Sequence, residues 1–388
     1  MSVMERDQKY IANTYARFPL VLTEGKGVRV KDENGKEYID LGSGIAVNTF
    51  GYADEHWVRA VSEQLTKLQH TSNLYYTEPA VALAQTLCER TGMKKVFFSN
   101  SGAEANECAI KAARKYFADK YEGKRKTIIT LTNSFHGRTI TTLAATGQAA
   151  FHQDFLPLTE GFVYADPTVE SLKGQLNRGD IGAILFEVVQ GEGGVLPLAQ
   201  EFVDFMRDIA QKDDILLIAD EVQIGNGRSG QLFGYMHYNL TPDIVSTAKG
   251  LGGGLPLGAT LLGEKVKDVL DAGSHGSTFG GNPVCCAGAL SIINRIDDDL
   301  LKEVKEKSAY IIEELSNAKG VKSISGLGLM LGIETATDAS DVIKKCMDKG
   351  VLVIKAKHKV RLLPALNIPW EDLKTAVDII KSVCAETA

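Results

Sequence analysis

Residues 215–254 read ILLIADEVQIGNGRSGQLFGYMHYNLTPDIVSTAKGLGGG, and they place one acid and one lysine after two apolar runs. Ile215 to Ala219 is a short apolar run followed by Asp220, which predicts a buried parallel strand with a carboxylate at its C-terminal end. Ile244 to Ala248 predicts a second strand, and Lys249 follows it directly, before a run of glycines. Ligands of open α/β sheets bind at the carboxyl ends of the strands, so Asp220 and Lys249 are candidates for one site.

The composition is that of an ordinary globular protein, with 388 residues of which 44% are hydrophobic and 24% charged. A chain of this length accommodates two domains. The net charge of −6, without a long Lys/Arg block, argues against nucleic acid or an anionic membrane as the main partner. The chain opens with no apolar leader, and no apolar run approaches the roughly 18 residues of a membrane span. We expect a cytoplasmic protein.

The cysteine and histidine patterns give no support for a metal site. The six cysteines include no C-x-x-C pair, and none has a histidine at ligand spacing. His136, His275 and His358 stand far apart in the chain. We predict that the cysteines are reduced and pack as small apolar side chains, and we expect no metal.

The two ends of the chain are predicted to build a small domain together. Val28 to Val30 and Tyr38 to Leu41 predict a hairpin closed by a turn that contains an Asn-Gly pair. The middle of the chain instead alternates apolar strands with helical segments, which predicts an α/β fold with a mostly parallel sheet between helices. We therefore expect a small α+β domain from residues 1–51 and 286–388, and a large domain that carries the ligand site at residues 52–285.

Another predicted strand, Val96 to Phe98, leads into a helix N-terminus. Ser101 and Glu104 form an S-x-x-E pattern, which predicts a capping box and a helix that begins near Gly102. On spacing alone, a capped helix without a ligand is the simpler interpretation. Together with the strands that end at the acid and the lysine, the free N–H groups and positive end of this helix indicate a phosphate site.

The remaining apolar segments predict the rest of the elements. Thr127 to Leu131 and Ala183 to Phe186 are expected to be parallel strands, and Gly258 to Leu262 an antiparallel one. Further elements are expected as two helices at 284–296 and up to about 318, one strand at 321–333, strands at 351–354 and 360–363, and a last helix from Trp370.

Several segments together resemble the class III, ornithine-type family of pyridoxal-phosphate (PLP) aminotransferases. They are the Asp220-Glu221-Val222-Gln223 run with Lys249 and its glycines, SGAEAN at 101–106, FHGRT at 135–139 and GSTFGGNP at 276–283. Within the family, NTYARFP at 13–19 and SNLYYTEP at 72–79 are similar to segments of acetylornithine aminotransferases. The resemblance runs nearly end to end and implies PLP fold type I.

The resemblance also implies roles for individual residues. In the family, the lysine at the position of Lys249 forms a Schiff base with the cofactor aldehyde, and the aspartate at the position of Asp220 hydrogen-bonds the pyridine nitrogen. A carboxylate there favours the protonated ring, which is a better electron sink. Cofactor binding is implied for Ser101, Gly102, Ala103, Phe135, Val222, Gln223 and Thr278, and substrate binding for Tyr15, Arg138, Glu192, Ser277 and Arg361.

Three of these implied roles concern the substrate and the partner subunit. The planar fork of Arg138 suits a substrate carboxylate, whereas Glu192 is expected to pair with Arg361 until glutamate arrives. The threonine at the position of Thr278 reaches the phosphate in the neighbouring subunit, which implies a homodimer with shared sites. Val188 stands where the family commonly has proline, and we expect only a local backbone effect.

The function implied by this resemblance is transamination of N-acetylornithine with 2-oxoglutarate, a step of arginine biosynthesis. An alternative is another ω-aminotransferase of the family, acting on ornithine, succinylornithine or succinyldiaminopimelate. A PLP-fold mutase or decarboxylase needs only altered substrate geometry. A PLP-fold binding protein without turnover would normally lack the lysine or the aspartate, and both are present here.

Overall fold

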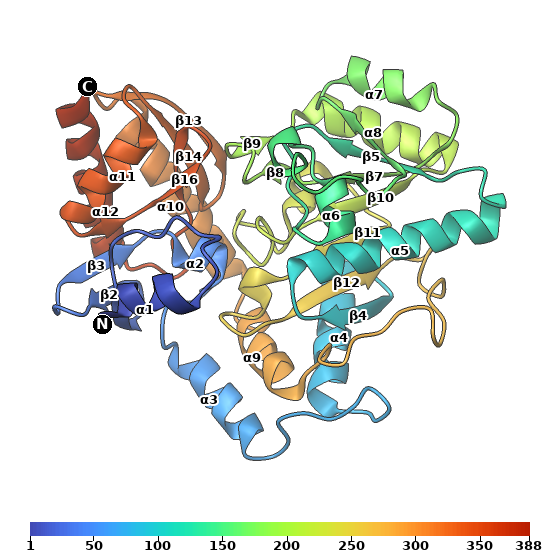
Figure 1. Cartoon of the computed structure of the whole chain (residues 1–388), viewed down its shortest axis with the longest axis horizontal. Coiled ribbons are helices and arrows are strands. Elements are labelled where there is room, and N and C mark those ends of the chain that lie inside the picture. The colour runs from blue at the N-terminus through green and yellow to red at the C-terminus, as the bar shows by residue number, and fades with distance from the viewer.

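The computed structural model describes residues 1–388 and has two regions, the larger of which is built on a seven-stranded sheet (Figure 1). The strand order is β4-β12-β11-β10-β7-β5-β6, and only β12 runs antiparallel to its neighbours. This arrangement confirms the mostly parallel sheet and the antiparallel return. The strands are β4 (Lys95–Ser99), β5 (Thr127–Leu131), β6 (Phe162–Ala165), β7 (Ile181–Phe186), β10 (Leu216–Asp220), β11 (Ile244–Thr247) and β12 (Gly258–Leu262).

Helices surround this sheet, and short segments join them. The longest is α5, which crosses the sheet and ends at the right-hand tip of Figure 1. The helical elements of this region are α3 (Glu55–Leu65), α4 (Glu78–Thr91), α5 (Gly102–Tyr121), α6 (Ile140–Ala145), η1 (Ala149–Phe151), α7 (Val169–Leu176), α8 (Gln200–Asp213), η2 (Gly234–Tyr238), η3 (Lys249–Leu251) and α9 (Pro283–Ile293). Two short strands, β8 (Val189–Gln190) and β9 (Leu196–Pro197), pair antiparallel with each other.

The two faces of the sheet bury alternate residues of each strand, as the period of two requires. Leu216 and Ile218 of β10 pack in the apolar cluster that α5 covers. Leu217 and Ala219 lie in the other, larger cluster, to which α8 also contributes. Asp220 continues the first series, so its carboxylate lies on the α5 side of the sheet.

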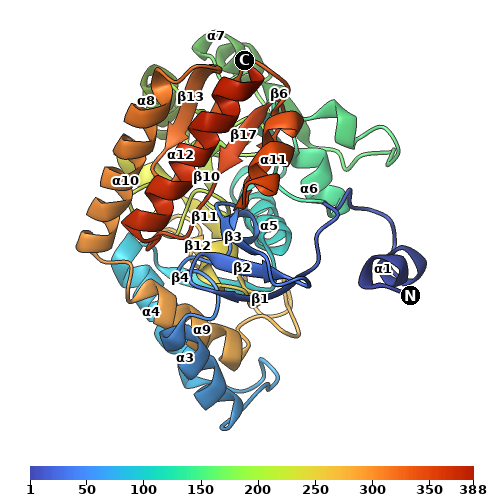
Figure 2. The same cartoon turned by 90° about the vertical axis from the view of Figure 1, so that its left-hand side faces the viewer.

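The smaller region joins the two ends of the chain in shared layers (Figures 1 and 2). Strand β3 pairs antiparallel with β2, which confirms the predicted hairpin, and pairs in parallel with β15 from the C-terminal part. Two four-stranded sheets lie in this region, beside helices α10 (Asp298–Ser316), α11 (Ala339–Asp348) and α12 (Trp370–Thr387). The first sheet consists of β1 (Leu22–Lys26), β2 (Arg29–Asp32), β3 (Glu37–Asp40) and β15 (Val351–Leu352). The second consists of β13 (Val321–Leu327), β14 (Met330–Thr335), β17 (Lys359–Leu362) and β16 (Ile354–Ala356).

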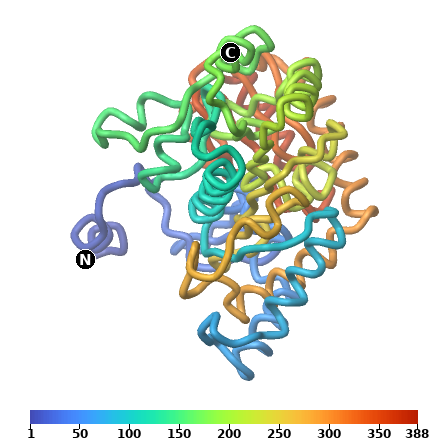
Figure 3. Tube along the Cα trace, turned by 90° about the vertical axis from the view of Figure 1, so that its right-hand side faces the viewer, coloured from blue at the N-terminus to red at the C-terminus, as the bar shows by residue number.

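Helix α1 (Val3–Tyr10) buries no residue and stands away from the rest of the chain in Figures 2 and 3. Its N-terminus is a capping box, because the Ser2 hydroxyl accepts from the Glu5 N–H and the Glu5 carboxylate accepts from the Ser2 N–H. None of the helices combines the length and the hydropathy that crossing a membrane requires.

Three sequence-based expectations differ from the structure. The single strand expected at 321–333 is wrong, because β13 and β14 form an antiparallel hairpin that turns at Gly328, where φ is +57°. The helix expected at 284–296 ends earlier, at Ile293. Helix α5 is capped by Ser101 as predicted, but the Glu104 carboxylate accepts from the N–H of Asn100 at 2.5 Å instead of from Ser101.

A left-handed turn connects the N-terminal strands to the larger region. The turn, α2, spans Ser43–Ala46 and has positive φ at all four positions, between +47° and +64°. Such a conformation costs on the order of 1–2 kcal/mol for each residue that has a side chain. Asp40 holds the turn in place, because its carboxylate accepts from the N–H groups of Gly42 and Ser43.

Candidate active site

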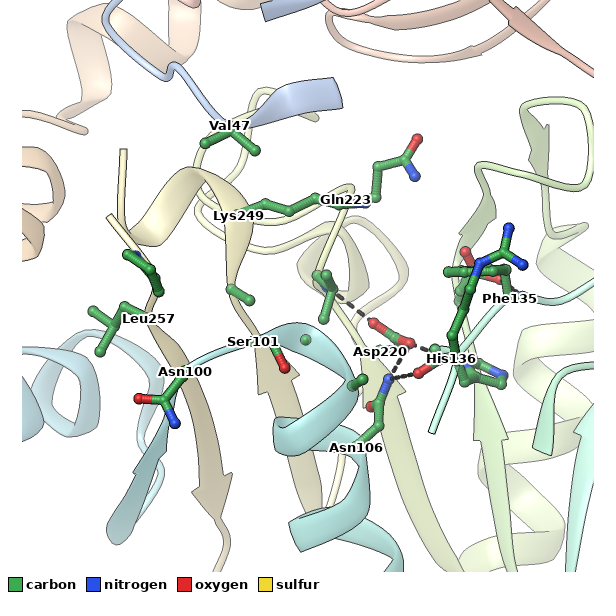
Figure 4. A pocket seen from close by; sticks show the side chains of 18 of the residues that line it. Val47, Asn100, Ser101, Asn106, Phe135, His136, Asp220, Gln223, Lys249 and Leu257 are labelled. Carbon is green, nitrogen blue, oxygen red and sulfur yellow. Dashed lines mark hydrogen bonds and ion pairs between the residues drawn. The ribbon is translucent and has the colours of Figure 1, made fainter. Parts of the chain in front are cut away.

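A cavity of about 540 Å³ lies at the carboxyl ends of the parallel strands. Figure 4 shows side chains from several strand ends and from α5 around this hollow, with Asp220 near Asn106 and His136. Asp220 is the last residue of β10, and Lys249 comes two residues after the end of β11, as the sequence indicated. The cavity is lined by ten of the predicted site residues: Tyr15, Ser101, Gly102, Ala103, Phe135, Arg138, Asp220, Val222, Gln223 and Lys249.

Asp220 is 5% exposed and is fixed by a hydrogen-bond network. Its Oδ2 accepts from Asn106 Nδ2 at 2.7 Å and lies 2.8 Å from His136 Nδ1, while its Oδ1 accepts from the Val222 N–H at 3.0 Å. Ser246 in turn donates to Asn106 Oδ1 at 2.5 Å. The carboxylate is therefore held in one orientation at the edge of the cavity.

The N-terminus of α5 forms one end of the cavity. The first intrahelical bond is donated by Ala105 to Ser101, so the N–H groups of Gly102 and Ala103 precede it. A Cβ on Gly102 would lie 2.6 Å from a Val222 methyl carbon, so only glycine fits between the helix and the β10 loop. Free amides and the positive end of the helix dipole make this wall an anion site.

Lys249 begins the short helix η3 with a φ of +46°, a conformation that costs energy for a residue with a side chain. Burial lowers the pKa of the Lys249 ammonium; Glu192 opposes this shift, and Arg361 reinforces it. The next residue, Gly250, packs against the left-handed turn, since a Cβ there would lie 3.4 Å from the carbonyl oxygen of Ala46 and 2.8 Å from Thr49 Oγ1. Lys249 is thus a nucleophile that burial favours in its neutral form.

A second wall carries an arginine with no acid partner. Arg138 is exposed at the cavity, and its guanidinium carbon lies 4.7 Å from the ring centre of Phe151 and 5.8 Å from that of Phe135. Aromatic contacts orient the guanidinium without consuming its hydrogen-bond donors. Arg138 is therefore available to a ligand carboxylate.

A second arginine, Arg361, is 2% exposed and already has an acid partner. Its Nη1 donates to Glu192 Oε1 at 2.6 Å and to Gln223 Oε1 at 2.9 Å, and Gln223 Nε2 donates to Glu192 at 3.3 Å. Burial, the largest single influence, opposes ionisation of Glu192, but Arg361 together with Lys249 and Gln223 outweighs it, so the pKa of Glu192 is lowered. The three side chains form one closed unit, and Gln223 connects it to the cavity.

Sequence reasoning gave no role to Asn106, His136 or Glu187. Glu187, at the end of β7, is buried, and its carboxylate accepts from the N–H groups of Phe135 at 3.0 Å and Gly191 at 3.3 Å. Burial, followed by the nearby Asp220, raises the pKa of Glu187 well above its ordinary value. This carboxyl group connects the Phe135 loop to the loop that carries Glu192. The only sign of this role in the sequence was the position of Glu187, a charged residue directly after a buried strand.

Besides Glu192 and Arg361, two more of the predicted residues, Ser277 and Thr278, are not part of the cavity lining. Ser277 Oγ accepts from Asn100 Nδ2 at 3.3 Å, whereas Thr278 is exposed. The nearby segment 74–76 is also exposed: Leu74 is 85% and Tyr76 is 99% accessible. The single chain therefore leaves Leu74, Tyr75 and Tyr76 uncovered close to Ser277, whose backbone carbonyl accepts from Asn73 Nδ2 at 2.9 Å.

Comparisons with known proteins identify the family of this chain. The sequence profile described as aminotransferase class-III matches residues 10–384. An acetylornithine aminotransferase from Haemophilus ducreyi is 51% identical over 387 residues, which cover 99% of this chain and 98% of that protein. One from Caldanaerobacter subterraneus is 45% identical over 388 residues, with 98% of each chain covered.

Solved structures give the same assignment. The ornithine aminotransferase of Toxoplasma gondii has a TM-score of 0.94 and 31% identity, covering 99% of this chain and 94% of that one. The N-acetylornithine aminotransferase of Stenotrophomonas maltophilia has a TM-score of 0.83 and 33% identity, with 99% of each chain covered. The chain belongs to the class-III aminotransferase family.

Proposed function

We propose that this protein is a PLP-dependent transaminase that moves an amino group from N-acetylornithine to 2-oxoglutarate. The observation that carries the proposal is the pair of arginines, one free at the cavity wall and one closed off by Glu192. One half-reaction uses a substrate that presents a terminal amine, and the other uses an α-amino dicarboxylic acid, which has a second carboxylate near its amine. Such a site needs one arginine that is always free to bind a carboxylate and a second that becomes free only when the dicarboxylic acid binds. The names of the similar proteins supply the substrate.

The residues of the cavity fit PLP. The first-turn amides of α5 and the Ser101 hydroxyl suit its phosphate, and the gap kept by Gly102 leaves Val222 beside one ring face, with Phe135 for the other. The buried Asp220 carboxylate suits a protonated ring nitrogen. When bound, the cofactor supplies a conjugated ring that accepts the electrons of the carbon–hydrogen bond that breaks.

The protein's own groups then bind the substrate and move the proton. Lys249 Nζ, whose pKa is lowered by burial, accepts the proton from the substrate carbon. Asn106 and His136 hold the Asp220 carboxyl group at a fixed position throughout. Arg138 binds the α-carboxylate of the acylated substrate and leaves the distal amine near Lys249.

Incubation of the purified enzyme with N-acetylornithine and 2-oxoglutarate tests the proposal by measuring glutamate formation. The kcat/KM for N-acetylornithine should exceed those for ornithine, succinylornithine and succinyldiaminopimelate. Ornithine is the main alternative, because an ornithine aminotransferase shares the fold at a TM-score of 0.94. A preference for ornithine would replace the substrate, and no transamination with any of them would refute the proposal.

Glu192→Gln should raise the ratio of kcat/KM for glutamate over N-acetylornithine. The amide keeps the shape of the side chain but cannot neutralise Arg361, so the guanidinium becomes available to the α-carboxylate of glutamate. A rise of about tenfold corresponds to ~1.4 kcal/mol. The two half-reactions are followed separately by the change in cofactor absorbance with each amine. Arg361→Gln is the matched control and should move the ratio in the opposite direction; an unchanged ratio in both variants would remove this pair from substrate selection.

We also propose a homodimer in which each site uses residues of both subunits. The support is the exposed apolar segment 74–76 beside Thr278, because large exposed apolar patches mark interaction surfaces. Thr278, which is exposed in the single chain, then binds the phosphate of PLP in the neighbouring site.

Mixed dimers of a Lys249→Ala chain and a Thr278→Ala chain should contain one unaltered site. If Thr278 acts across the interface, the site with an intact Lys249 receives its threonine from the Lys249→Ala chain, in which Thr278 is unchanged. The activity of the mixed dimer at low PLP should then match the wild type for each working site, whereas the Thr278→Ala homodimer needs more PLP. A mixed dimer with the same PLP requirement as that homodimer would show that Thr278 acts within its own subunit.

Two further proposals concern organisation and location. We propose a small domain of residues 1–51 and 286–388 and a large domain of residues 52–285, supported by the pairing of β3 with β15. We propose a cytoplasmic location, supported by the six free cysteines, since disulfides are rare in reducing compartments.

A further inference from the structure

A second cavity, of about 470 Å³, lies at the opposite end of the strands from the active site. We call it the distal cavity. It is formed where β5, β6 and β7 begin and α5 ends. The end of α5 is the right-hand tip of the ribbon in Figure 1. Its charged lining residues are Arg114, Arg125, Lys126, Arg178, Glu160 and Asp180.

The two acids leave most of this positive charge unpaired. Asp180 accepts from Thr127 Oγ1 at 2.6 Å and from Arg178 Nε at 3.3 Å, and these two donors, Thr127 first, lower its pKa. Glu160 is exposed, and only its backbone carbonyl takes part in a hydrogen bond. Arg114, Arg125 and Lys126 form no ion pair, although the chain as a whole carries a net charge of −6. Unpaired cations gathered in one concavity of an acidic protein attract anions.

Arg114 is held rigidly without an acid partner. Its guanidinium carbon lies 5.3 Å from the ring centre of Phe162, and one nitrogen donates to the Glu160 carbonyl at 2.6 Å. Gly161 has a φ of +95°, and a Cβ there would lie 3.0 Å from the same guanidinium. Burial lowers the pKa of Arg114, and the more distant Glu107 offsets only part of this effect. A partly desolvated guanidinium with spare donors gains energy from an anion.

Arg125 is oriented in a similar way. Its guanidinium carbon lies 4.3 Å from the ring centre of Tyr121, and its Nη1 donates to the carbonyls of Asp213 and Asp214. Two guanidinium groups are thus stacked on aromatic rings, and Lys126, which directly follows Arg125 in the chain, adds a third cation to the lining. Little side-chain freedom remains to be lost when a ligand binds.

We propose that the distal cavity binds a small oxyanion with two negative charges, through Arg114, Arg125 and Lys126. The chemistry fits inorganic phosphate and small dicarboxylates alike, since each presents several oxygens to planar guanidinium donors. The site is separate from the active site, because the same strands run from one cavity to the other and their full length lies between them.

Residue-specific labelling of the PLP-saturated enzyme tests the proposal. Phenylglyoxal modification of Arg114 and Arg125 and acetylation of Lys126 are measured by peptide mass spectrometry, with phosphate or succinate added separately. Protection of these residues is expected, while the exposed Lys374 on α12 keeps its reactivity as the internal control. The arm that protects at lower concentration identifies the preferred anion class.

Two variants make the test independent of labelling. Arg114→Gln should weaken binding of the preferred anion, measured by calorimetry on PLP-saturated enzyme, about tenfold or more. Lys126 is exposed, so Lys126→Gln should weaken binding of the anion less than Arg114→Gln does. Both should leave transamination unchanged, whereas Arg138→Gln should keep the distal binding and lose activity. Labelling that neither anion changes, or a binding isotherm that neither variant alters, would overturn the proposal.

Discussion

Lys249→Ala is expected to abolish transamination and to leave the fold intact. The variant lacks the only amine placed by the end of β11 in the cavity, so neither the nucleophile nor the proton acceptor remains. We expect kcat to fall at least about 10⁴-fold, equivalent to ~5.4 kcal/mol of lost transition-state stabilisation. Steady-state glutamate formation measures the loss, and turnover at the level of the wild type would contradict the role of Lys249.

Stability should not fall in this variant. The pKa of Lys249 is lowered in the folded chain, so the unfolded chain binds this proton more readily. The lysine therefore destabilises the folded chain at every pH below its ordinary pKa, and this cost is complete once the pH falls below the lowered pKa of the folded state. Replacing the lysine by alanine removes this cost. Alanine at a φ of +46° is strained about as much as lysine. Thermal unfolding of the PLP-free chains at pH 7 should therefore give an equal or higher Tm for Lys249→Ala. Lys249→Arg is the control that keeps a cation, and it should be inactive as well.

Asp220→Asn is expected to have the second largest effect. The wild-type carboxylate accepts hydrogen bonds at both oxygens, from Asn106 and His136 on one side and from the Val222 N–H on the other. An asparagine amide turned either way presents N–H to at least one of these donors, and the negative charge is lost. We expect kcat to fall about a thousandfold, or ~4 kcal/mol, with a loss of stability of about 1–3 kcal/mol from the unpaired donor.

Single-turnover kinetics with substrate deuterated at the reacting carbon separates the two consequences. A larger isotope effect is expected in Asp220→Asn, because proton transfer becomes the slow step when the ring nitrogen loses its carboxylate. Asp220→Glu keeps the charge and should retain more activity than the asparagine variant. An unchanged single-turnover rate in Asp220→Asn would leave Asp220 with a structural role only.

The principal strand ends could be predicted because each is a local pattern. An apolar run followed by an acid, a lysine or a capped helix identifies β10, β11 and β4 without knowledge of the fold. The hairpin of β13 and β14 was missed because its apolar residues continue through the turn, where the glycines at 326 and 328 both have positive φ. A turn of this kind is decided by backbone freedom at those two positions, which a hydrophobic pattern does not report.

The network around Asp220 could not be predicted for a different reason. Asn106 lies on α5, His136 follows β5 and Ser246 lies on β11, so their bonds exist only after three elements pack together. Glu187 likewise connects two loops that are distant in the chain. The substrate-binding roles of Arg138, Glu192 and Arg361 were implied by the resemblance to a known family. Their spacing in the sequence alone does not indicate that they bind a substrate.

The parallel pairing of β3 with β15 sets an order for folding during synthesis. Ile39 leaves the ribosome long before Val351, its partner, and at the usual rate of synthesis the delay is on the order of 15 to 60 s. During this time the edge of β3 has no neighbour, and the apolar residues Ile39 and Leu41, which are buried in the finished chain, have nothing to cover them. The nascent N-terminal hairpin therefore keeps an unpaired strand edge until residue 351 has been made, and a chain that stops before residue 351 would expose this edge permanently.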